Sequence, residues 1–565
     1  MGRKVVIVGG VAGGASVATR VRRLDESAKV IVFEKGPYPS FSNCCLPNFL
    51  SRQIASSESL LLMTVENFKN QYNIDVRVLN EVIKIKAKDK KIIVKNIETG
   101  KEYEESYDEL ILAPGSNAIM PRSIKGIDKK HVFSVKNVPD IVALDNYISE
   151  NKVKDIVVVG GGFIGLEVME NLKLKGYNLS LVEAENQIMD PLDYDMSQIL
   201  NREIVGKGVN LIFNDAVKEI HDDRVILGSG KKILSDCVVM AVGIYPETSL
   251  AKNSGIELGV TGGIKVNQHY ETSIPGIYAV GDVIESKHFI TRKPTMLSLA
   301  GPAQRQARAC ADHIYGLPSR NKGVVGSSII KLFDMNAAST GLNEKQCKES
   351  GIDYMYSYII PKDKVGIMPN SNPLFFKLIF DYPSGKILGA QAVGKGNIDK
   401  RIDLVGSIIQ MNGTLYDLKE MELAYSPEFG TAKDAVNIAA LVGINLLNGR
   451  YKQVAVTKIR DLVEKGAFIV DVREKDEYDL GHIKNSINIP LSELRGRMGE
   501  IPKDRPVYVQ CRSGQRSYNA VLALQGNGYK DVYNVQGSMI GLCNYEYYND
   551  KVSGREPIVT NYNFN

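Results

Sequence analysis

Short apolar runs that lead into glycine-rich turns recur along this chain and predict buried strands. Residues 4–8 and 156–159 each form such a run, and each turn is followed by a helix-like stretch and a second apolar strand. The second strand ends in an acid in both copies, Glu34 in the first and Glu183 in the second. Because strands that alternate with helices build parallel sheets, the repeat predicts two α/β units of one kind.

The hydrophobic pattern changes in the second half of the chain. Residues 327–448 mix apolar strands such as 375–380 with a helix that begins near Asp399, which predicts a unit of mixed architecture. The more polar stretch 447–457 is typical of a linker. Short strands follow it, beginning with 468–472, and they predict a separate α/β unit at the end of the chain.

Composition narrows the class of protein. At 565 residues with 44% hydrophobic positions, the chain is long enough for about three to four domains with ample core. The 70 basic and 65 acidic residues leave a net charge of +5, without the basic excess that nucleic acid demands. Seven cysteines are an odd number, which favours reduced thiols over a disulfide framework. No segment has the apolar length that a bilayer requires, so we expect a cytoplasmic protein with neither membrane nor nucleic-acid partners.

The first glycine turn, at residues 9–14, is an imperfect dinucleotide fingerprint. Gly9 permits a tight turn and Gly14 permits close helix packing, but Val11 takes the third position, where glycine is usual. The helix N-terminus still offers N–H groups to a pyrophosphate, and Glu34 can accept from ribose hydroxyls. The alternative is a glycine turn that binds no ligand. The strand, helix and acid together favour a nucleotide site.

The second turn matches the fingerprint fully with Gly160, Gly162 and Gly165. Glu183 at the end of the next strand favours the free 2′-hydroxyl of NAD over the 2′-phosphate of NADP, so we expect NADH, although a nearby Arg or Lys could reverse this preference. Two dinucleotide sites in one chain imply electron transfer between two cofactors, and a flavin is the usual first acceptor of hydride.

Two further segments complete a pattern of four motifs. Residues 107–116 form a strand and turn, and residues 277–282 place an acid after a strand. In this order the motifs resemble the pyridine-nucleotide disulfide oxidoreductase family over about residues 1–450. The resemblance implies FAD on the first fold and NAD(P)H on an inserted second fold. It assigns FAD binding to Gly9, Gly14, Glu34, Asn43, Gly115, Gly281 and Asp282.

The redox centre implied by the resemblance is a single cysteine. The C-x4-C pair of many members is absent, whereas Cys44 and Cys45 follow Asn43. This resembles the single-cysteine branch, which includes coenzyme A disulfide reductases, persulfide reductases, and NADH oxidases and peroxidases. Cys44 matches the reactive position, and its thiolate needs a pKa lowered by a helix N-terminus or a cation; the alternative is a pair of buried small residues. Cys45 could resolve a persulfide on Cys44, form a vicinal disulfide, or be a neutral replacement.

Other positions help to distinguish the members of the single-cysteine branch. Oxygen- and peroxide-reducing relatives carry a histidine in the first glycine loop, where this chain has Val11 and Ala12. The resemblance also implies a homodimer in which Tyr425 reaches the partner's thiol. A second tyrosine pattern is missing from residues 363–370, which argues against plain coenzyme A disulfide reduction. Coenzyme A binding is assigned to Arg20, Arg23, Ser40, Asn43, Gln304 and Arg305; the alternative is a solvated basic helix face.

The last unit resembles a single rhodanese domain. A loop at 511–517 follows strand 507–510, and its backbone N–H groups can converge on the Cys511 sulfur. The C-x5-R position of a cysteine phosphatase holds Ser517 here, so the shorter loop favours sulfur over phosphate. The remaining alternative is an inactive scaffold. The predicted sulfur loop consists of Cys511, Arg512, Ser513, Gly514, Gln515 and Arg516, with both arginines adding positive potential. Packing roles and no metal are expected for Cys237, Cys310, Cys347 and Cys543.

Together these features predict an α/β protein with two Rossmann-like folds, an α+β dimerisation domain and a C-terminal rhodanese domain. The predicted boundaries are 1–150 and 244–326 for the two parts of the FAD domain, 151–243 for the NAD(P)H domain, 327–447 for the dimerisation domain, 448–457 for a linker and 458–565 for the rhodanese domain.

Over nearly its whole length the chain resembles the fused coenzyme A disulfide reductase–rhodanese family, also called NADH-dependent persulfide reductases. This implies hydride transfer from NADH to FAD, reduction of a sulfane-sulfur or disulfide substrate held on Cys44, and handling of sulfane sulfur by Cys511. The alternatives are an NADH oxidase or peroxidase with an accessory tail, and a non-catalytic redox sensor.

Overall fold

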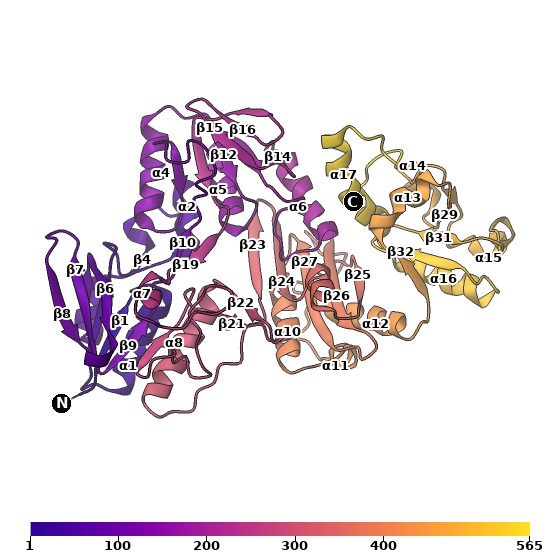
Figure 1. The fold of residues 1–565 in the computed structure, drawn as a ribbon. Coiled ribbons are helices and arrows are strands. Elements are labelled where there is room, and N and C mark those ends of the chain that lie inside the picture. Colours follow the sequence, from indigo (N-terminus) through magenta and orange to yellow (C-terminus); the bar gives the residue numbers. More distant parts are fainter. Residues whose placement is uncertain (1, 565) are drawn as a thin grey trace. The chain divides into compact units, whose positions relative to one another are not determined.

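The computed structural model describes residues 2–564 and contains two compact units (Figure 1). One unit comprises Met1–Ala184 and Ile212–Val324, and the other comprises Glu185–Leu211 and Val325–Asn565. No helix in the described part of the chain is both long and apolar enough to span a membrane.

The first unit contains a parallel sheet built around the opening strand of the chain. Its strand order is β20 (Ile277–Ala279), β9 (Glu109–Leu112), β1 (Lys4–Val8), β2 (Lys29–Glu34) and β5 (Asp75–Val78). Val5, Val6 and Ile7 have no exposed surface, because a parallel sheet is covered on both faces. Helix α1 (Ala12–Leu24) packs against α8 (Ala300–Ile314), which follows the last strand.

A second parallel arrangement in the same unit holds the second glycine turn. Its strands include β11 (Val132–Ser134), β18 (Cys237–Met240), β12 (Asp155–Val159) and β13 (Asn178–Val182). Helix α5 spans Phe163–Leu174, and Gly162 serves as its N-cap. The two predicted α/β repeats are thus confirmed. Antiparallel strands β6 (Asn80–Lys86), β7 (Lys91–Asn96) and β8 (Glu102–Ser106) form a separate layer.

The second unit begins with an antiparallel sheet. The order is β23 (Ser328–Leu332), β24 (Met335–Gly341), β27 (Ile387–Gly394), β26 (Leu374–Asp381) and β25 (Tyr354–Ile359). Helices α10 (Asp399–Gln410) and α12 (Ala435–Leu447) pack on this sheet. The predicted strand 375–380 lies within β26, and the predicted helix begins at Asp399, as expected.

The C-terminal part of the second unit is a parallel sheet. Its order is β28 (Lys452–Val454), β32 (Val532–Val535), β31 (Val507–Gln510), β29 (Phe468–Asp471) and β30 (Ile487–Asn488). Residues 452–454 lie in the predicted linker, yet they pair with β32. A short edge strand with polar residues has the composition of a linker, so the sequence pattern does not distinguish the two. Helices α16 (Gln515–Gly526) and α17 (Ser538–Ser553) complete this part.

Candidate functional site

The first glycine turn has the geometry of a nucleotide-binding loop despite Val11. A Cβ atom on Gly9 would lie 2.1 Å from the Ala113 carbonyl oxygen, and one on Gly14 would lie 1.8 Å from the Gly9 oxygen. Val11 is the N-cap of α1, and its side chain makes no capping hydrogen bond. No side chain therefore caps the first N–H groups of α1, which leaves them for an anion such as a pyrophosphate. Val11 replaces glycine without closing the turn.

The Glu34 side chain is hydrogen-bonded to this turn. Its two carboxylate oxygens accept hydrogen bonds from the backbone N–H groups of Gly10 and Gly36, both at 2.8 Å. Burial raises the pKa of Glu34, and these two hydrogen bonds oppose the rise. Besides the predicted contact with a ribose, Glu34 thus holds the glycine turn in place.

The second turn is more open. Gly160 and Gly165 are packed so closely that a Cβ atom on either would lie 2.3 Å or less from a carbonyl oxygen, whereas a Cβ on Gly162 would meet no atom within 4 Å. Gly162 caps α5 without a side-chain hydrogen bond. Glu183 accepts from the Gly161 N–H at 2.6 Å. The open backbone at Gly162 fits the close approach of a dinucleotide phosphate.

A polar cluster lies at the carboxyl end of the first sheet. The Lys136 ammonium donates to the Ser116 hydroxyl at 2.8 Å and lies 3.7 Å from the Asp282 carboxylate, which also accepts from Ser116 at 3.1 Å. The N–H of Gly281 donates to the Gln306 side chain at 2.8 Å. Gln306 was not among the predicted residues. The predicted Gly115 has a φ of +77°, which favours glycine at the turn before Ser116.

Cys44 lies in a short 3₁₀ turn, Asn43–Cys45, directly before helix α2 (Leu46–Leu50). Its thiol is free and exposed, and that of Cys45 is half-buried. Although exposed, the Cys44 sulfur has enough protein around it that desolvation raises its pKa. The negative charge of Glu167 is the second cause of this rise, whereas Lys136 lowers the pKa. The expected lowering by a helix terminus or a cation is therefore wrong in sign, because burial and nearby carboxylates outweigh Lys136.

Glu167 is a residue that the sequence reasoning missed. It lies on α5, which packs against α2. The Ser51 hydroxyl at the end of α2 donates to the Asn171 side chain at 2.5 Å, and Glu167 precedes Asn171 by one helical turn, on the same face of α5. Burial first, then the charge of Glu170, raises the pKa of Glu167 to about 7. Its position two residues after the last glycine of the second turn was the available signal.

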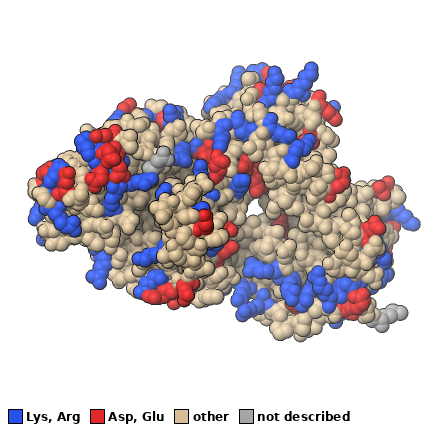
Figure 2. Space-filling view, turned by 180° about the vertical axis from the view of Figure 1, so that it is seen from behind, with Lys and Arg blue, Asp and Glu red and all other residues tan. Residues whose placement is uncertain are grey.

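The basic residues assigned to coenzyme A occupy different environments. Arg20 is ion-paired with Asp312 of α8 at 2.5 Å, and the Arg23 guanidinium lies 5.6 Å from the Tyr72 ring centroid. Gln304 and Arg305 are exposed, whereas Ser40 is buried. Arg20 is therefore already neutralised by an internal partner. Figure 2 shows Lys and Arg side chains interspersed with Asp and Glu over the displayed face, as the balanced composition predicts.

Cys511 lies at the end of β31, where its sulfur is held by hydrogen bonds. The sulfur accepts from the Gly514 N–H at 3.2 Å and from the Ser517 hydroxyl at 3.4 Å, and its side chain is buried. Gly514 has a φ of +107° and caps helix α16. A sulfur atom at a helix N-terminus with such donors is well placed to carry negative charge.

Arg516 lies near enough to Cys511 for their charges to interact, but it also has an acidic partner. Both of its terminal nitrogens bind the Glu477 carboxylate, at 2.6 and 2.7 Å. Glu477 lies on α14 (Lys475–Asp479), and this pair offsets part of the positive charge of Arg516.

Tyr425 lies in the segment between α11 (Leu415–Glu420) and α12. Its side chain is 49% exposed, and that of Phe429 in the same segment is 62% exposed. Two aromatic side chains thus remain uncovered within one protomer. Such exposure is typical of a surface that contacts another chain.

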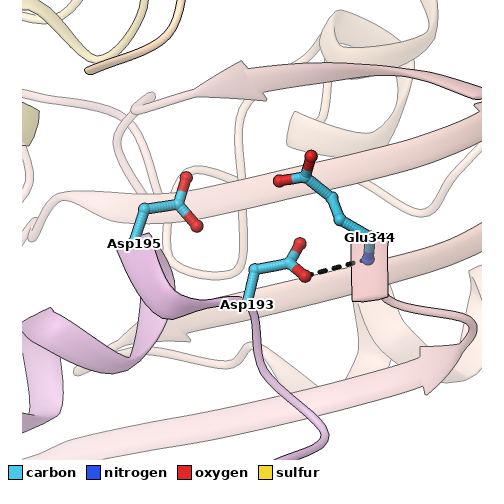
Figure 3. Close-up of side chains that lie close together, drawn as sticks. All are labelled: Asp193, Asp195 and Glu344. Atoms are coloured by element: carbon cyan, nitrogen blue, oxygen red, sulfur yellow. Dashed lines mark hydrogen bonds between the residues drawn. The ribbon is translucent and has the colours of Figure 1, made fainter. Parts of the chain in front are cut away.

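Three carboxylates of the second unit lie close together (Figure 3), and one buried lysine pairs with all three. Asp193, Asp195 and Glu344 lie 3.0, 2.9 and 2.6 Å from the Lys377 ammonium. Asp193 also accepts from the backbone N–H of Glu344 at 2.9 Å. The Lys377 ammonium offsets part of this negative charge, and the resulting ion-pair network holds the start of α6 (Tyr194–Gly206) to the antiparallel sheet.

Three family models match successive parts of the chain. The model of the pyridine nucleotide-disulphide oxidoreductase family matches residues 3–307, that of its dimerisation domain matches 327–435, and that of the rhodanese-like domain matches 455–544. Coenzyme A disulfide reductase of Staphylococcus epidermidis is 36% identical over 436 residues, covering 77% of this chain and 98% of that protein.

Two solved structures resemble nearly the whole chain. Reduced CoADR-RHD of Bacillus anthracis has a TM-score of 0.93 at 44% identity, covering 97% of this chain and 99% of that one. An NAD-dependent persulfide reductase from A. fulgidus has a TM-score of 0.90 at 32% identity, covering 95% and 99%. With the two glycine turns and the Cys511 loop, these matches show that the chain belongs to the pyridine nucleotide-disulphide oxidoreductase family and carries a C-terminal rhodanese-like domain.

Proposed function

We propose that this protein is an NADH-dependent flavoenzyme that reduces sulfane-sulfur or disulfide substrates on Cys44, and that its rhodanese domain handles sulfane sulfur on Cys511. One observation carries the proposal: the free, exposed Cys44 thiol lies within electrostatic reach of Asp282 and Lys136. Asp282 follows β20 at the carboxyl end of the first parallel sheet, the edge at which such sheets bind ligands, and Lys136 lies 3.7 Å from its carboxylate.

The two uncapped glycine turns fit two dinucleotides. We assign FAD to the turn at Gly9 and Gly14, with Glu34, Asn43, Gly115, Gly281 and Asp282, and NADH to the turn at Gly160, Gly162 and Gly165, with Glu183. When bound, the flavin would accept hydride and pass electrons to sulfur. The Glu183 carboxylate follows β13 and accepts a hydrogen bond from the Gly161 N–H. An acid at this position disfavours the 2′-phosphate of NADPH.

At Cys44 the chain's own residues govern the sulfur chemistry. The Cys44 thiolate attacks a persulfide R–S–SH at its outer sulfur, the donor's S–S bond breaks, and R–S⁻ leaves. Two electrons, ultimately from NADH, then cleave the new Cys44 S–S bond and release hydrosulfide. Lys136 favours the attacking thiolate and Glu167 opposes it, so protonation of Glu167 near neutral pH favours the reactive form.

We assign coenzyme A binding to Arg20, Arg23, Ser40, Asn43, Gln304 and Arg305. Within the protomer Arg20 is ion-paired with Asp312, so the other five residues carry most of the assignment. We also infer a homodimer, since the chain carries the family's dimerisation domain and leaves Tyr425 exposed. In the dimer Tyr425 would serve the partner's Cys44. Cys45, half-buried beside Cys44, is an accessory thiol that could resolve a persulfide on Cys44.

The Cys511 loop supports persulfide chemistry because Gly514 and Ser517 donate to the sulfur. A persulfide anion there gains the same donors. Cys511 can then present sulfane sulfur to a small carrier thiol for delivery to Cys44. If Cys511→Ala leaves every sulfur-donor activity unchanged, this coupling is wrong.

The test is anaerobic NADH oxidation by the purified protein with coenzyme A persulfide, coenzyme A disulfide and polysulfide in parallel, with Cys44→Ser as the control. We expect turnover with persulfide or polysulfide that is lost in Cys44→Ser. Preference for coenzyme A disulfide would make the protein a thiol-pool reductase. Activity with oxygen or peroxide alone would overturn the proposal in favour of an oxidase or peroxidase.

A further inference from the structure

The last ten described residues, which we call the C-terminal tail (residues 555–564), form a fixed part of the rhodanese domain. Helix α17 ends at Ser553, and Gly554 with a φ of +62° turns the chain back. Val559 forms an antiparallel bridge with Ile483, and the N–H of Thr560 donates to the His482 carbonyl at 2.9 Å. The Val559 side chain is buried, so this tail is packed rather than free.

Three residues at the end of the tail have anchors of their own. The Asn561 side chain donates to the Leu480 carbonyl at 3.3 Å, and the Tyr562 hydroxyl donates to Asp550 at 2.5 Å. The backbone N–H of Asn563 donates to the Cys543 sulfur at 3.3 Å. These contacts hold residues 561–563 in one place on the domain surface.

Residues 561–563 form one wall of a cavity of about 490 Å³, a size common for small-ligand sites. Its other walls are Arg473, Glu477, Leu480, Arg512, Met539 and Ile540.

Several of these walls are tied to the sulfur loop. The N–H groups of Met539 and Ile540 donate to the carbonyls of Cys511 and Arg512, at 3.1 and 3.0 Å. Arg512 itself follows Cys511, and Glu477 is ion-paired with Arg516 of the same loop. The cavity therefore lies beside the loop that carries Cys511, the cysteine that accepts sulfur in the proposed function.

The lining has the chemistry of a site for an organic anion. The Arg512 guanidinium supplies the positive charge, since the buried Arg473 is already ion-paired with Asp471 at 2.7 Å. Leu480, Met539 and Ile540 supply apolar surface. An inorganic donor such as thiosulfate needs none of this apolar surface, whereas a persulfide on an organic carrier would use it.

We propose that Asn561, Tyr562 and Asn563 complete a binding pocket beside the Cys511 loop for an anionic organic persulfide or thiol, so that the C-terminal tail selects the carrier from which Cys511 takes sulfur. The inference rests on the proposed role of Cys511. In the step it serves, the Cys511 thiolate attacks the outer sulfur of R–S–SH. The donor's S–S bond breaks, a new S–S bond forms on Cys511, and the electron pair leaves with R–S⁻. No other oxidant or reductant is needed.

The experiment measures formation of the Cys511 persulfide by mass spectrometry in the full-length protein carrying Cys44→Ser, so that reduction does not remove the product. Coenzyme A persulfide, glutathione persulfide and thiosulfate serve as donors. The test variant is Asn561→Ala combined with Asn563→Ala. The matched control is Glu556→Gln, a tail residue outside the pocket whose carboxylate pairs with Lys484 at 2.5 Å.

We expect the double variant to slow persulfide formation from at least one organic donor about fivefold or more at low donor concentration, through lost hydrogen bonds. The rate should recover at saturating donor, which identifies binding rather than chemistry. Thiosulfate and the Glu556→Gln control should stay within about twofold of the parent protein. The organic donor whose rate of persulfide formation falls more in the double variant is the carrier that the pocket accepts.

Two results would overturn the inference while leaving the proposed function intact. One is an unchanged rate with both organic donors in the double variant. The other is an equal loss with thiosulfate, which would show that the tail only supports the fold. A parent protein that forms no Cys511 persulfide with any donor would instead remove the proposed role of Cys511 itself.

Discussion

Cys44 and Cys511 are both free cysteines that precede a helix, yet their surroundings differ in kind. At Cys44 desolvation is the largest cause that opposes the thiolate; the charges of Glu167, Cys45 and Asp282 add to it, and Lys136 favours the thiolate. Cys511 is buried and receives direct hydrogen bonds from Gly514 and Ser517. The comparison indicates that one thiol is controlled by adjustable charges, and the other by a fixed set of donors.

The largest effect is expected when each of the two thiols is replaced in turn. Cys44→Ser should reduce NADH-dependent sulfide release from polysulfide about a thousandfold or more, because a nucleophile has no substitute. Cys511→Ser should retain most of this activity with soluble polysulfide. Steady-state sulfide release measures both. Equal losses in the two variants would show that the thiols act as one unit and would break the comparison.

A smaller effect is expected from removing one donor at Cys511. Ser517→Ala deletes the hydroxyl that donates to the Cys511 sulfur at 3.4 Å. We expect sulfur transfer from thiosulfate to fall about fivefold to tenfold, as for loss of one hydrogen bond to a charged group. NADH-dependent turnover at Cys44 serves as the internal control and should not change. An unaltered transfer rate would mean that the Gly514 N–H alone stabilises the sulfur.

The charge at Cys44 is tested by Glu167→Gln. Glu167 has a pKa of about 7, so it gains negative charge as the pH rises through neutrality and then opposes the Cys44 thiolate. Removing that charge should lower the pKa of Cys44 and raise its alkylation rate by iodoacetamide at pH 8 about threefold. The alkylation rate of Cys511, followed by peptide mapping, should stay constant. A slower reaction of Cys44 would show that Glu167 assists the thiolate instead.

The smallest effect is expected at Arg516 of the Cys511 loop, whose positive charge is partly offset by Glu477. Glu477→Gln removes the carboxylate that pairs with Arg516 at 2.6 Å, leaving its charge to act on Cys511. We expect the second-order rate with thiosulfate to rise about twofold, since partly exposed charges are screened by water. The gain should disappear in high salt. A salt-independent change would indicate an altered loop rather than released charge.

Features set by local rules were predictable from sequence. Gly9, Gly14, Gly160 and Gly165 lie where a Cβ atom would overlap backbone, as the fingerprint predicts. The acid Glu183 likewise lies at a strand end, as its place in the pattern indicates.

Features that depend on distant partners were not predictable in this way. Nothing near Arg516 in sequence points to Glu477, and Arg20 meets Asp312 only because α1 packs against α8. The pKa of Cys44 is raised first by burial and then by the charge of Glu167, and α5, which carries Glu167, packs against α2. Charge balance at a site is a property of packing between elements, and a single sequence does not encode it in any local pattern.

The division of labour between the thiols is tested most directly by locating sulfur. The protein is loaded anaerobically with polysulfide, NADH is added, and peptide mass spectrometry follows the persulfides on Cys44 and Cys511 over time. We predict that NADH removes sulfur from Cys44 first, with sulfide released in step, while the Cys511 persulfide persists until Cys44 is free. Prompt NADH-dependent loss from Cys511 in a protein whose Cys44 never carries sulfur would contradict the account.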